Sequence, residues 1–323
     1  SRFSYARNKN VLPPGGGQGY LTALMRFPRD KDARQYENPD GTRILTLPAA
    51  TPGTDNDNPF FNVNNSAREE QTDRTNANIS LKADLTPWLS LTGRFGADIY
   101  ATNANRFFHP FSNIGFPRGG WLENYTDLGR LLNSNFFANV RKSFGKLSTS
   151  FQIGGSLDDR RYETTSVYGE KLFLPDFNSI NNVEPTTMRN KTILTRQRLL
   201  GAFAQANFTF DEWLTLNVTA RNDWSSTLPV ENRSYFYPSV GLSWNIMDMP
   251  FLKSKPSVVD FFKLRATFAE VGNPAPPYKI RARLVPQTST GGGFLYDFFG
   301  DNPFLKPETV RSYEFGTELG FFK

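Results

Sequence analysis

The chain has 323 residues, a net charge of +6, no cysteine and a single histidine, His109. The absence of cysteine excludes disulfide scaffolds, thiolate nucleophiles and cysteine-based metal centres, and one histidine is too few for a two-histidine metal site. Basic residues are spread along the chain, which argues against a nucleic-acid surface. No apolar run of about 18 residues could form a membrane helix, but transmembrane β-strands, which alternate apolar and polar residues, remain compatible with this composition.

The first part of the chain, residues 1–74, is polar and rich in turn residues, with a glycine run at residues 15–17 and several prolines. It shows no sustained alternation, so we expect a loop-rich region with a short helix around residues 21–26. Within it, Asp55 and Asp57 have the spacing of a calcium loop, but the glycine and distal glutamate of that loop are missing. A polar loop is therefore the favoured interpretation, and we predict no metal site.

From residue 75 onward, apolar residues recur at every second position, which predicts β-strands. The composition agrees, because 15% of the residues are aromatic and aromatic side chains favour strands. We count about nine or ten strands, many of them longer than the usual five or six residues. Residues 249–260 break the alternation and predict a short helical or irregular turn. The clearest strands cover residues 77–85, 214–221, 236–246, 262–268 and 313–321.

The predicted connections alternate in length. Tight turns fall at residues 86–88, around Gly145 and at residues 211–212, whereas long segments rich in Asn, Gly and Pro lie between them. The long segments are residues 106–130, 163–190 and 273–308. A strand tilted by about 45° needs roughly 9–11 residues to cross a bilayer, and short turns at one end with long loops at the other are typical of outer-membrane barrels. The sequence thus predicts an all-β fold, part of a large antiparallel transmembrane β-barrel with short periplasmic turns and long extracellular loops.

Two of the short turns carry a tryptophan, Trp88 and Trp213, followed by a strand with apolar residues at alternate positions. In a barrel these side chains would belong to the aromatic girdle at the membrane interface. The alternative is that they cap the core of a soluble protein. Adjacent carboxylates, as in Glu69-Glu70 and Asp158-Asp159, point to opposite faces of a strand, so we predict no acid/base pair and no catalytic residue.

Four segments carry a family resemblance: RNDWSSTLP, NRSYFYPSVGLSW, KLRATFAEVGNPA and NPFLKPETVRSYEFGTELGFF. They start at residues 221, 232, 263 and 302 and resemble the SusC/RagA family of TonB-dependent outer-membrane transporters. The resemblance implies the outer membrane of a Gram-negative bacterium of the Bacteroidota and a barrel of the 22-stranded, plugged type. It also implies a SusD-like surface lipoprotein as a lid, energy from TonB, import of oligosaccharides or oligopeptides, and no cofactor.

The resemblance does not extend to every part of that architecture. No segment matches the plug domain or its TonB-interacting segment, and about ten strands cannot close a barrel of 22. We therefore expect an internal piece of a longer protein, with residues 1–74 forming a loop-rich region that contributes wall segments and residues 75–323 forming barrel strands and extracellular loops. Outer-membrane lipid and lipopolysaccharide are the expected surroundings, and the mild positive charge would suit contact either with anionic lipopolysaccharide or with acidic ligands, without deciding between them.

A cluster of aromatic residues is expected in the long loop on the outer face: Phe107, Phe108, His109, Trp121 and Tyr125. Flat rings with polar edges can stack on sugars or hold apolar peptide side chains, so these are the candidate substrate-binding residues. The alternative is that they pack the loop against its neighbours or the lid. Two further functions stay open, a secreted polysaccharide-binding β-sandwich and a β-rich glycan hydrolase with a carboxylate pair.

Overall fold

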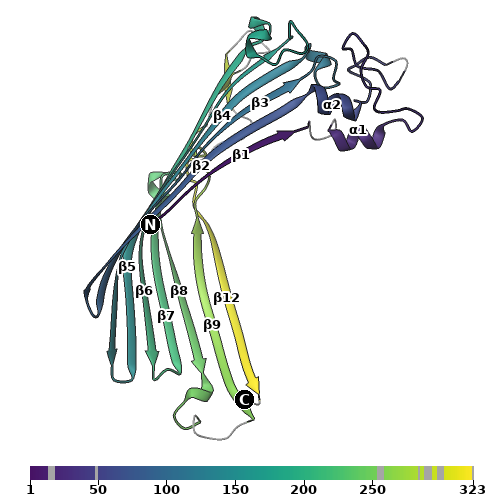
Figure 1. The fold of residues 1–323 in the computed structure, drawn as a ribbon. Coiled ribbons are helices and arrows are strands. Elements are labelled where there is room, and N and C mark those ends of the chain that lie inside the picture. The colour runs from purple at the N-terminus through teal and green to yellow at the C-terminus, as the bar shows by residue number, and fades with distance from the viewer. Residues whose placement is uncertain are drawn as a thin grey trace.

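The computed structural model describes residues 1–13, 19–47, 50–252, 258–282, 284–286, 293–296 and 302–321. Ten strands form one antiparallel sheet in the order β1-β2-β3-β4-β5-β6-β7-β8-β9-β12, and β10 pairs with β11 in a separate ribbon (Figure 1). The strands are β1 (Arg2–Leu12), β2 (Ala67–Thr86), β3 (Leu89–Phe108), β4 (Trp121–Phe144), β5 (Leu147–Glu170), β6 (Arg189–Phe210), β7 (Leu214–Ser225), β8 (Ser234–Asn245), β9 (Val259–Asn273), β10 (Leu284–Pro286), β11 (Phe294–Tyr296) and β12 (Glu308–Phe321).

The tight turns lie at one end of the sheet, together with the longer β8–β9 connection that begins with η6, and the other loops lie at the opposite end (Figure 1). The predicted turns at residues 86–88, Gly145 and residues 211–212 are confirmed. Asp211 and Glu212 both have positive φ, 46° and 67°, as a tight hairpin turn needs in order to match the twist of its strands. The described helices are α1 (Tyr20–Arg26), α2 (Pro59–Asn65), η2 (Phe116–Arg118), η3 (Ile180–Asn182), η4 (Pro185–Thr187), η5 (Val230–Asn232) and η6 (Ile246–Asp248).

The sheet has two chemically different faces, because residues directly opposite each other across strands point the same way. What we call the apolar face carries large hydrophobic side chains that remain exposed, such as Leu81 (63%), Ile153 (66%) and Phe315 (83%). What we call the polar face carries the residues between them. Members of the polar face include Ser80, Thr92, Arg94, Asn133, Gln152, Asn207, Asn217 and Ser239.

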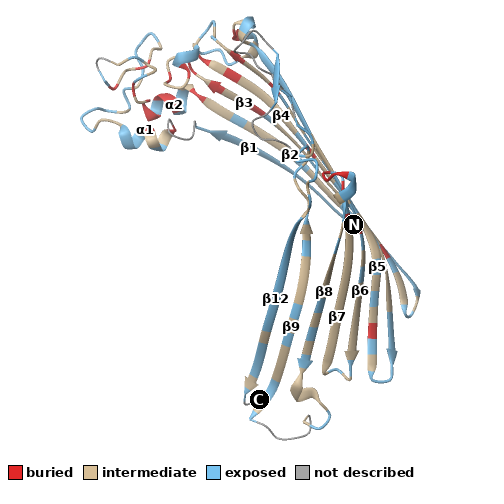
Figure 2. Cartoon of the chain, turned by 180° about the vertical axis from the view of Figure 1, so that it is seen from behind, coloured by how far each residue is buried: buried red, intermediate tan, exposed pale blue. Residues whose placement is uncertain are grey.

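Exposure of the alternating hydrophobic residues identifies the kind of sheet. Figure 2 shows the strands mostly intermediate or exposed, with the buried residues gathered toward the long-loop end. A soluble sandwich would bury these residues between two packed sheets, so the β-sandwich alternative is wrong for the described strands. A continuous exposed apolar face of this length is that of a barrel wall in lipid. None of the described helices is both long and apolar enough to cross a membrane.

Small cores form only where the loops fold back. Phe107, Leu122 and Val183 are buried together, with Leu172 and Ile180 packed against them. Here the loop between β5 and β6 covers the end of the apolar face. Helices α1 and α2 lie beside the same end of the sheet (Figure 1). The predicted helix at residues 21–26 corresponds to α1, and Asn58 caps α2 by accepting a hydrogen bond from the Phe60 backbone N–H at 2.8 Å.

The strands extend further than the alternation predicts. β1 lies in the region expected to be loops, and β2 begins at Ala67, so the division at residue 74 falls inside a strand. β3 and β4 likewise extend into the expected loop 106–130, which shrinks to residues 109–120. The physical reason is that both faces are polar beyond the apolar stretch, so a strand there shows no two-residue hydropathy period. The glycine run at residues 15–17 lies outside the described residues.

Candidate functional site

Aromatic rings from three strands meet on the polar face at the long-loop end. Phe108 lies directly opposite Trp121 in the β3–β4 register, and the two rings stack with centroids 4.3 Å apart at 18°. Tyr168 of β5 follows, its ring centroid 5.5 Å from that of Trp121. Such cross-strand aromatic pairs form because opposite side chains on one face lie within contact distance. We call Phe108, Trp121, Tyr125 and Tyr168 the aromatic platform.

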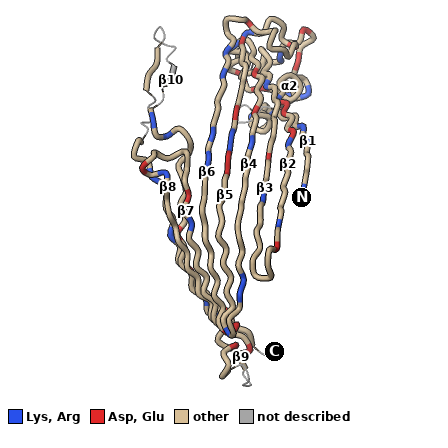
Figure 3. Tube along the Cα trace, turned by 90° about the vertical axis from the view of Figure 1, so that its left-hand side faces the viewer, with Lys and Arg blue, Asp and Glu red and all other residues tan. Residues whose placement is uncertain are grey.

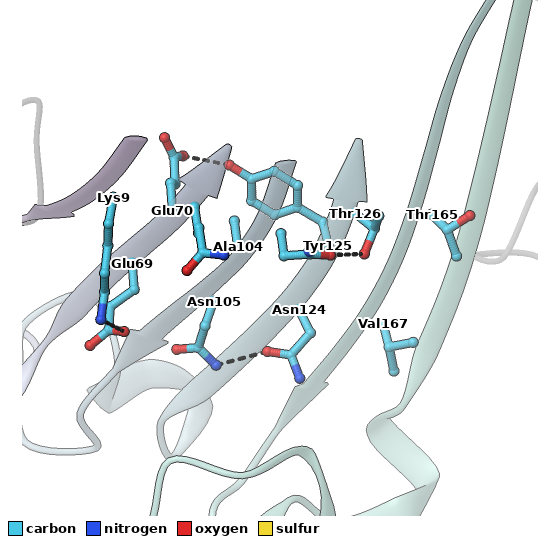
Figure 4. Close-up of a pocket in the computed structure, with 12 residues that line it drawn as sticks. Lys9, Glu69, Glu70, Ala104, Asn105, Asn124, Tyr125, Thr126, Thr165 and Val167 are labelled. Atoms are coloured by element: carbon cyan, nitrogen blue, oxygen red, sulfur yellow. Dashed lines mark hydrogen bonds and ion pairs between the residues drawn. The ribbon is translucent and has the colours of Figure 1, made fainter. Parts of the chain in front are cut away.

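Charged groups surround the platform. The guanidinium of Arg118 lies 5.9 Å from the Trp121 ring centroid and donates to the Tyr168 hydroxyl at 3.0 Å. Arg106 lies 4.7 Å from the Tyr125 ring centroid, within cation–π range. The Tyr125 hydroxyl donates to Glu70 (Figure 4). The platform therefore offers flat apolar rings whose edges are lined with both acidic and basic groups, a combination that binds sugars or peptide segments.

The five predicted site residues divide between two environments. Phe108, Trp121 and Tyr125 are on the platform, although Trp121 and Tyr125 belong to β4 and not to the expected loop. Phe107 and His109 are buried elsewhere. The alternation of strand side chains causes the division, since Phe107 points to the face opposite that of Phe108. A substrate-binding role for the platform remains a prediction.

His109 is a packing residue at the base of the loop between β3 and β4. Its side chain is buried, and its Nδ1 accepts the Phe111 backbone N–H at 3.2 Å. Its Nε2 therefore carries the proton and donates to the Asp176 carboxylate at 3.1 Å. The ring also packs edge-to-face on Phe61, with centroids 5.3 Å apart. Burial lowers the pKa of His109, and the charge of Asp176 offsets only part of that effect.

A second group on the polar face was not predicted. Asp223 of β7 accepts hydrogen bonds from Arg221 (Nε–Oδ1, 2.9 Å) and from the Tyr237 hydroxyl. Tyr235 stacks on Tyr237, and its buried hydroxyl has no hydrogen-bond partner within the described residues. Asp223 and Tyr235 line a cavity of about 530 Å³ together with Asp158, Arg160 and Gln197. The signal in the sequence is the pair of charged residues at alternate positions in RNDW, Arg221 and Asp223, which lie on one face of a strand.

The predicted carboxylate motifs are engaged in ion pairs. Arg43 is buried with its Nη1 at 3.3 Å from Asp55 and 3.5 Å from Asp57, so both carboxylates of the candidate calcium loop hold a guanidinium. Asp159 binds Arg196 and Arg198, each at 2.8 Å. Within the part of the chain that the structure describes, no group of three His, Asp or Glu side chains could hold a metal ion.

Trp88 and Trp213 both lie at the short-turn end, in the turns between β2 and β3 and between β6 and β7. Trp88 is half exposed, and its carbonyl accepts the Arg141 backbone N–H at 2.8 Å. The Trp213 ring contacts Phe210 edge-on, with centroids 5.7 Å apart. Their place at one end of the apolar face is where a girdle would lie, and their interfacial role stays a prediction.

Comparison with known proteins identifies the family. Residues 9–323 match the family described as TonB dependent receptor-like, beta-barrel, and the chain belongs to that family. Over 317 residues it is 27% identical to TonB-dependent receptor P3 of Formosa agariphila, covering 95% of this chain and 30% of that protein. It is 24% identical to TonB-dependent receptor SusC of Bacteroides thetaiotaomicron over 200 residues, 61% of this chain and 19% of SusC. The resemblance to SusC/RagA transporters is thus confirmed.

Solved structures agree on the fold. The chain superimposes on the RagAB peptide importer in its closed-closed state with a TM-score of 0.72 at 18% sequence identity, covering 88% of this chain and 32% of that one. A second structure, of the RagAB peptide transporter, gives a TM-score of 0.69 at 19% identity and the same coverage. The chain spans about a third of the length of these solved chains and of receptor P3, so it is the fold of the barrel wall that these structures support.

Proposed function

We propose that this chain is part of the barrel wall of a TonB-dependent importer in the outer membrane. The wall serves as a scaffold for transport and not as a catalyst. The apolar face contacts lipid, the polar face lines the lumen, and the long-loop end opens to the cell exterior. Trp88 and Trp213 would anchor the short-turn end at the periplasmic interface. The observation that carries the proposal is the single sheet with one exposed apolar face and one polar face that bears the aromatic platform.

The substrates we propose are oligosaccharides or oligopeptides. The platform supports this choice because stacked rings bind flat apolar surfaces of sugars and peptide side chains, while Arg118, Glu70 and Arg106 supply hydrogen bonds at the ring edges. A SusD-like lipoprotein would cover the vestibule as a lid. Substrate held between the lid and the platform would pass inward when TonB remodels a plug supplied by the rest of the protein. Each polar contact contributes modestly, so selectivity would come from their number and geometry.

The test is uptake by cells carrying the full-length protein. In a strain lacking the gene, we would measure import of a labelled panel of oligosaccharides and oligopeptides after complementation with wild type or with a Phe108→Ala/Trp121→Ala double variant. Wild type should restore TonB-dependent uptake of at least one class, and the double variant should lower its initial rate at subsaturating substrate about tenfold, because two stacked rings are lost.

A matched control removes an aromatic ring from the opposite face. Phe136→Ala deletes an exposed ring on the apolar face of β4, so it should leave the rate of uptake unchanged once the amounts in the outer membrane are equalised. Equal uptake by the strain lacking the gene and the complemented strain, for every member of the panel, would refute the importer. Fractionation of the protein into the soluble fraction would refute the barrel placement itself.

A further inference from the structure

Three arginines lie side by side on the apolar face where its hydrophobic stretch ends. Arg130 of β4 is directly opposite Arg161 of β5, which is directly opposite Arg196 of β6. Arg198 lies two residues along β6 from Arg196 and points to the same face. Figure 3 shows basic residues partway along β5 and β6. Like charges opposite each other in a sheet are destabilising, so such an arrangement calls for anions between them. We call these four residues the arginine row.

The protein's own carboxylates neutralise only part of this charge. Asp159 binds Arg196 and Arg198, each at 2.8 Å, and Glu163 binds Arg161 at 2.9 Å. Arg130 has no ion pair within the described residues, and its Nε is buried without a hydrogen-bond partner. Four guanidinium groups against two carboxylates leave a net charge of +2. The side chains of Arg161, Arg196 and Arg198 are 40–54% exposed, so the row combines an unbalanced positive charge with guanidinium groups that an external anion can reach.

Toward the short-turn end, the surface next to the row is hydrophobic. Leu132, Leu157 and Leu200 are exposed there on three adjacent strands. Leu157 and Leu200 are directly opposite each other, and Leu132 is directly opposite Asp159, the carboxylate that binds Arg196 and Arg198. The arginine row therefore lies directly beside this leucine surface, at its long-loop end.

Toward the long-loop end, Leu128, Glu163 and Leu194 follow the row, and beyond them the same face becomes polar. Asn103, Thr126 and Thr165 lie opposite one another across β3, β4 and β5, and the next pair along is Asn105 with Asn124 (Figure 4). They line a cavity of about 480 Å³ together with Gln71, Lys9 and Glu69. Amide and hydroxyl groups of this kind hydrogen-bond sugar hydroxyls. Thr126 is four residues from Arg130 along β4, about 13 Å at the rise of a strand.

We propose that this face binds a lipopolysaccharide molecule of the outer leaflet. Its acyl chains would lie on the leucines, a phosphate of its acylated disaccharide would bind the arginine row through Arg130 and Arg161, and its sugar chain would occupy the amide-lined cavity. The order of apolar, cationic and sugar-binding surface along β4 and β5 matches the order of these parts in the lipid. A phospholipid would supply the phosphate but nothing for the cavity. The inference rests on the proposed placement in the outer membrane.

The experiment uses full-length protein extracted with mild detergent from its own outer membrane. We would measure bound lipopolysaccharide per protein by native mass spectrometry and by a sugar assay, for wild type and for an Arg130→Gln/Arg161→Gln double variant. Lipopolysaccharide retention should fall about tenfold in the double variant, since each substitution removes charge-assisted hydrogen bonds to phosphate. Arg94→Gln, the same change on the polar face, should retain the wild-type amount.

A second variant separates sugar recognition from phosphate recognition. Thr126→Leu/Thr165→Leu should lower the affinity for the sugar-bearing lipid while leaving the affinity for the sugarless acylated disaccharide phosphate unchanged. Equal lipopolysaccharide retention in wild type and in the arginine double variant, with both correctly inserted, would overturn the inference, as would selective retention of phospholipid. Uptake measured in the same cells separates failure of this inference from failure of the proposed function. Lipid binding that does not depend on the arginines, with uptake intact, would contradict only the lipopolysaccharide site. Absence of the protein from the outer membrane would contradict the proposed function.

Discussion

The rings of Phe108 and Trp121 lie directly across β3 and β4 from one another and stack 4.3 Å apart on the polar face. Their chain neighbours Phe107 and Leu122 form the next pair in the same register, but both are buried on the opposite face beneath the loop that carries Val183. Adjacent residues of the same strand thus lie in two different environments, one on the polar face and one in the buried core. The same two strand ends build a platform on the polar face and, on the opposite face, a core that packs against the loop between β5 and β6.

If the platform binds substrate as proposed, Arg118 should affect which ligands it prefers, because its guanidinium lies over Trp121 and donates to Tyr168. We expect Arg118→Gln to weaken binding of carboxylate-bearing oligomers about fivefold, which corresponds to about 1 kcal/mol. Neutral oligomers should bind nearly as before. Calorimetry on the full-length protein with paired acidic and neutral ligands makes the comparison. Arg141→Gln, near the short-turn end of β4, is the control, and an equal loss for both ligand types would contradict the assignment.

Leu122 should anchor the loop between β5 and β6. Its side chain is fully buried against Phe107 and Val183, so Leu122→Ala leaves a cavity and should destabilise this local core by about 2–5 kcal/mol. Hydrogen exchange of residues 171–188 should accelerate accordingly. Leu128 lies on the same face of β4 but is 47% exposed, so Leu128→Ala should leave exchange in that loop unchanged. Equal exchange rates in the two variants would show that Leu122 does not hold the loop.

Arg43 should be among the most sensitive charged residues in the loops beside α2. Both carboxylates and three backbone carbonyls converge on its guanidinium, at 2.9 Å for the carbonyl of Phe111 and 2.8 Å for those of Asn56 and Pro52. Arg43→Met leaves two buried carboxylates without their cation and should cost about 3–5 kcal/mol of local stability. Limited proteolysis between residues 30 and 66 measures this loss of local stability as faster cleavage. Arg34→Met removes an exposed pair with Asp32 and should leave the rate of proteolysis close to that of wild type.

The turn after β3 should weaken in acid because of His109. The folded state lowers the pKa of this residue, so the unfolded loop binds a proton more readily, and local stability falls as the pH drops below about 6.5. Protection factors for Ser112 and Phe116, whose backbone N–H groups donate to the carbonyls of His109 and Ser112, should be constant above pH 7.5 and decrease toward pH 5.5. A His109→Gln variant should show no such step, and a step that persists there would assign it to another group.

The sequence was sufficient for the strands that have one apolar face, and insufficient toward the long-loop end. In β7, Leu214, Leu216 and Val218 alternate with polar residues, so one face is apolar and the other polar, and the predicted strand forms there. In β1, Arg7 and Lys9 occupy the same face as Phe3 and Tyr5, so the period is lost, and this strand was not predicted. A strand whose two faces both meet water is specified by pairing with its neighbour, which hydropathy does not record.

The candidate site was predicted in composition but not in arrangement. Phe107, Phe108 and His109 are adjacent in the chain, and only knowledge of where β3 ends shows that they diverge. Tyr168 and Arg118 could not be linked to Trp121 from the sequence, because the register of β4 with β5 brings Tyr168 close and the η2 turn brings Arg118 close. Residues placed together by register are invisible to motif searches that follow one segment at a time.

The length of β4 and β5 has a consequence for where capture takes place. Each strand has 24 residues, about 80 Å at the rise of a β-strand, whereas the hydrocarbon layer is about 30 Å thick. Even with a tilt of about 40°, roughly half of this wall stands clear of the bilayer. Trp121 and Tyr168 lie at its upper rim. Under the proposed function, substrate would first contact the protein well outside the headgroup layer. A bulky polymer could therefore bind there without displacing lipid.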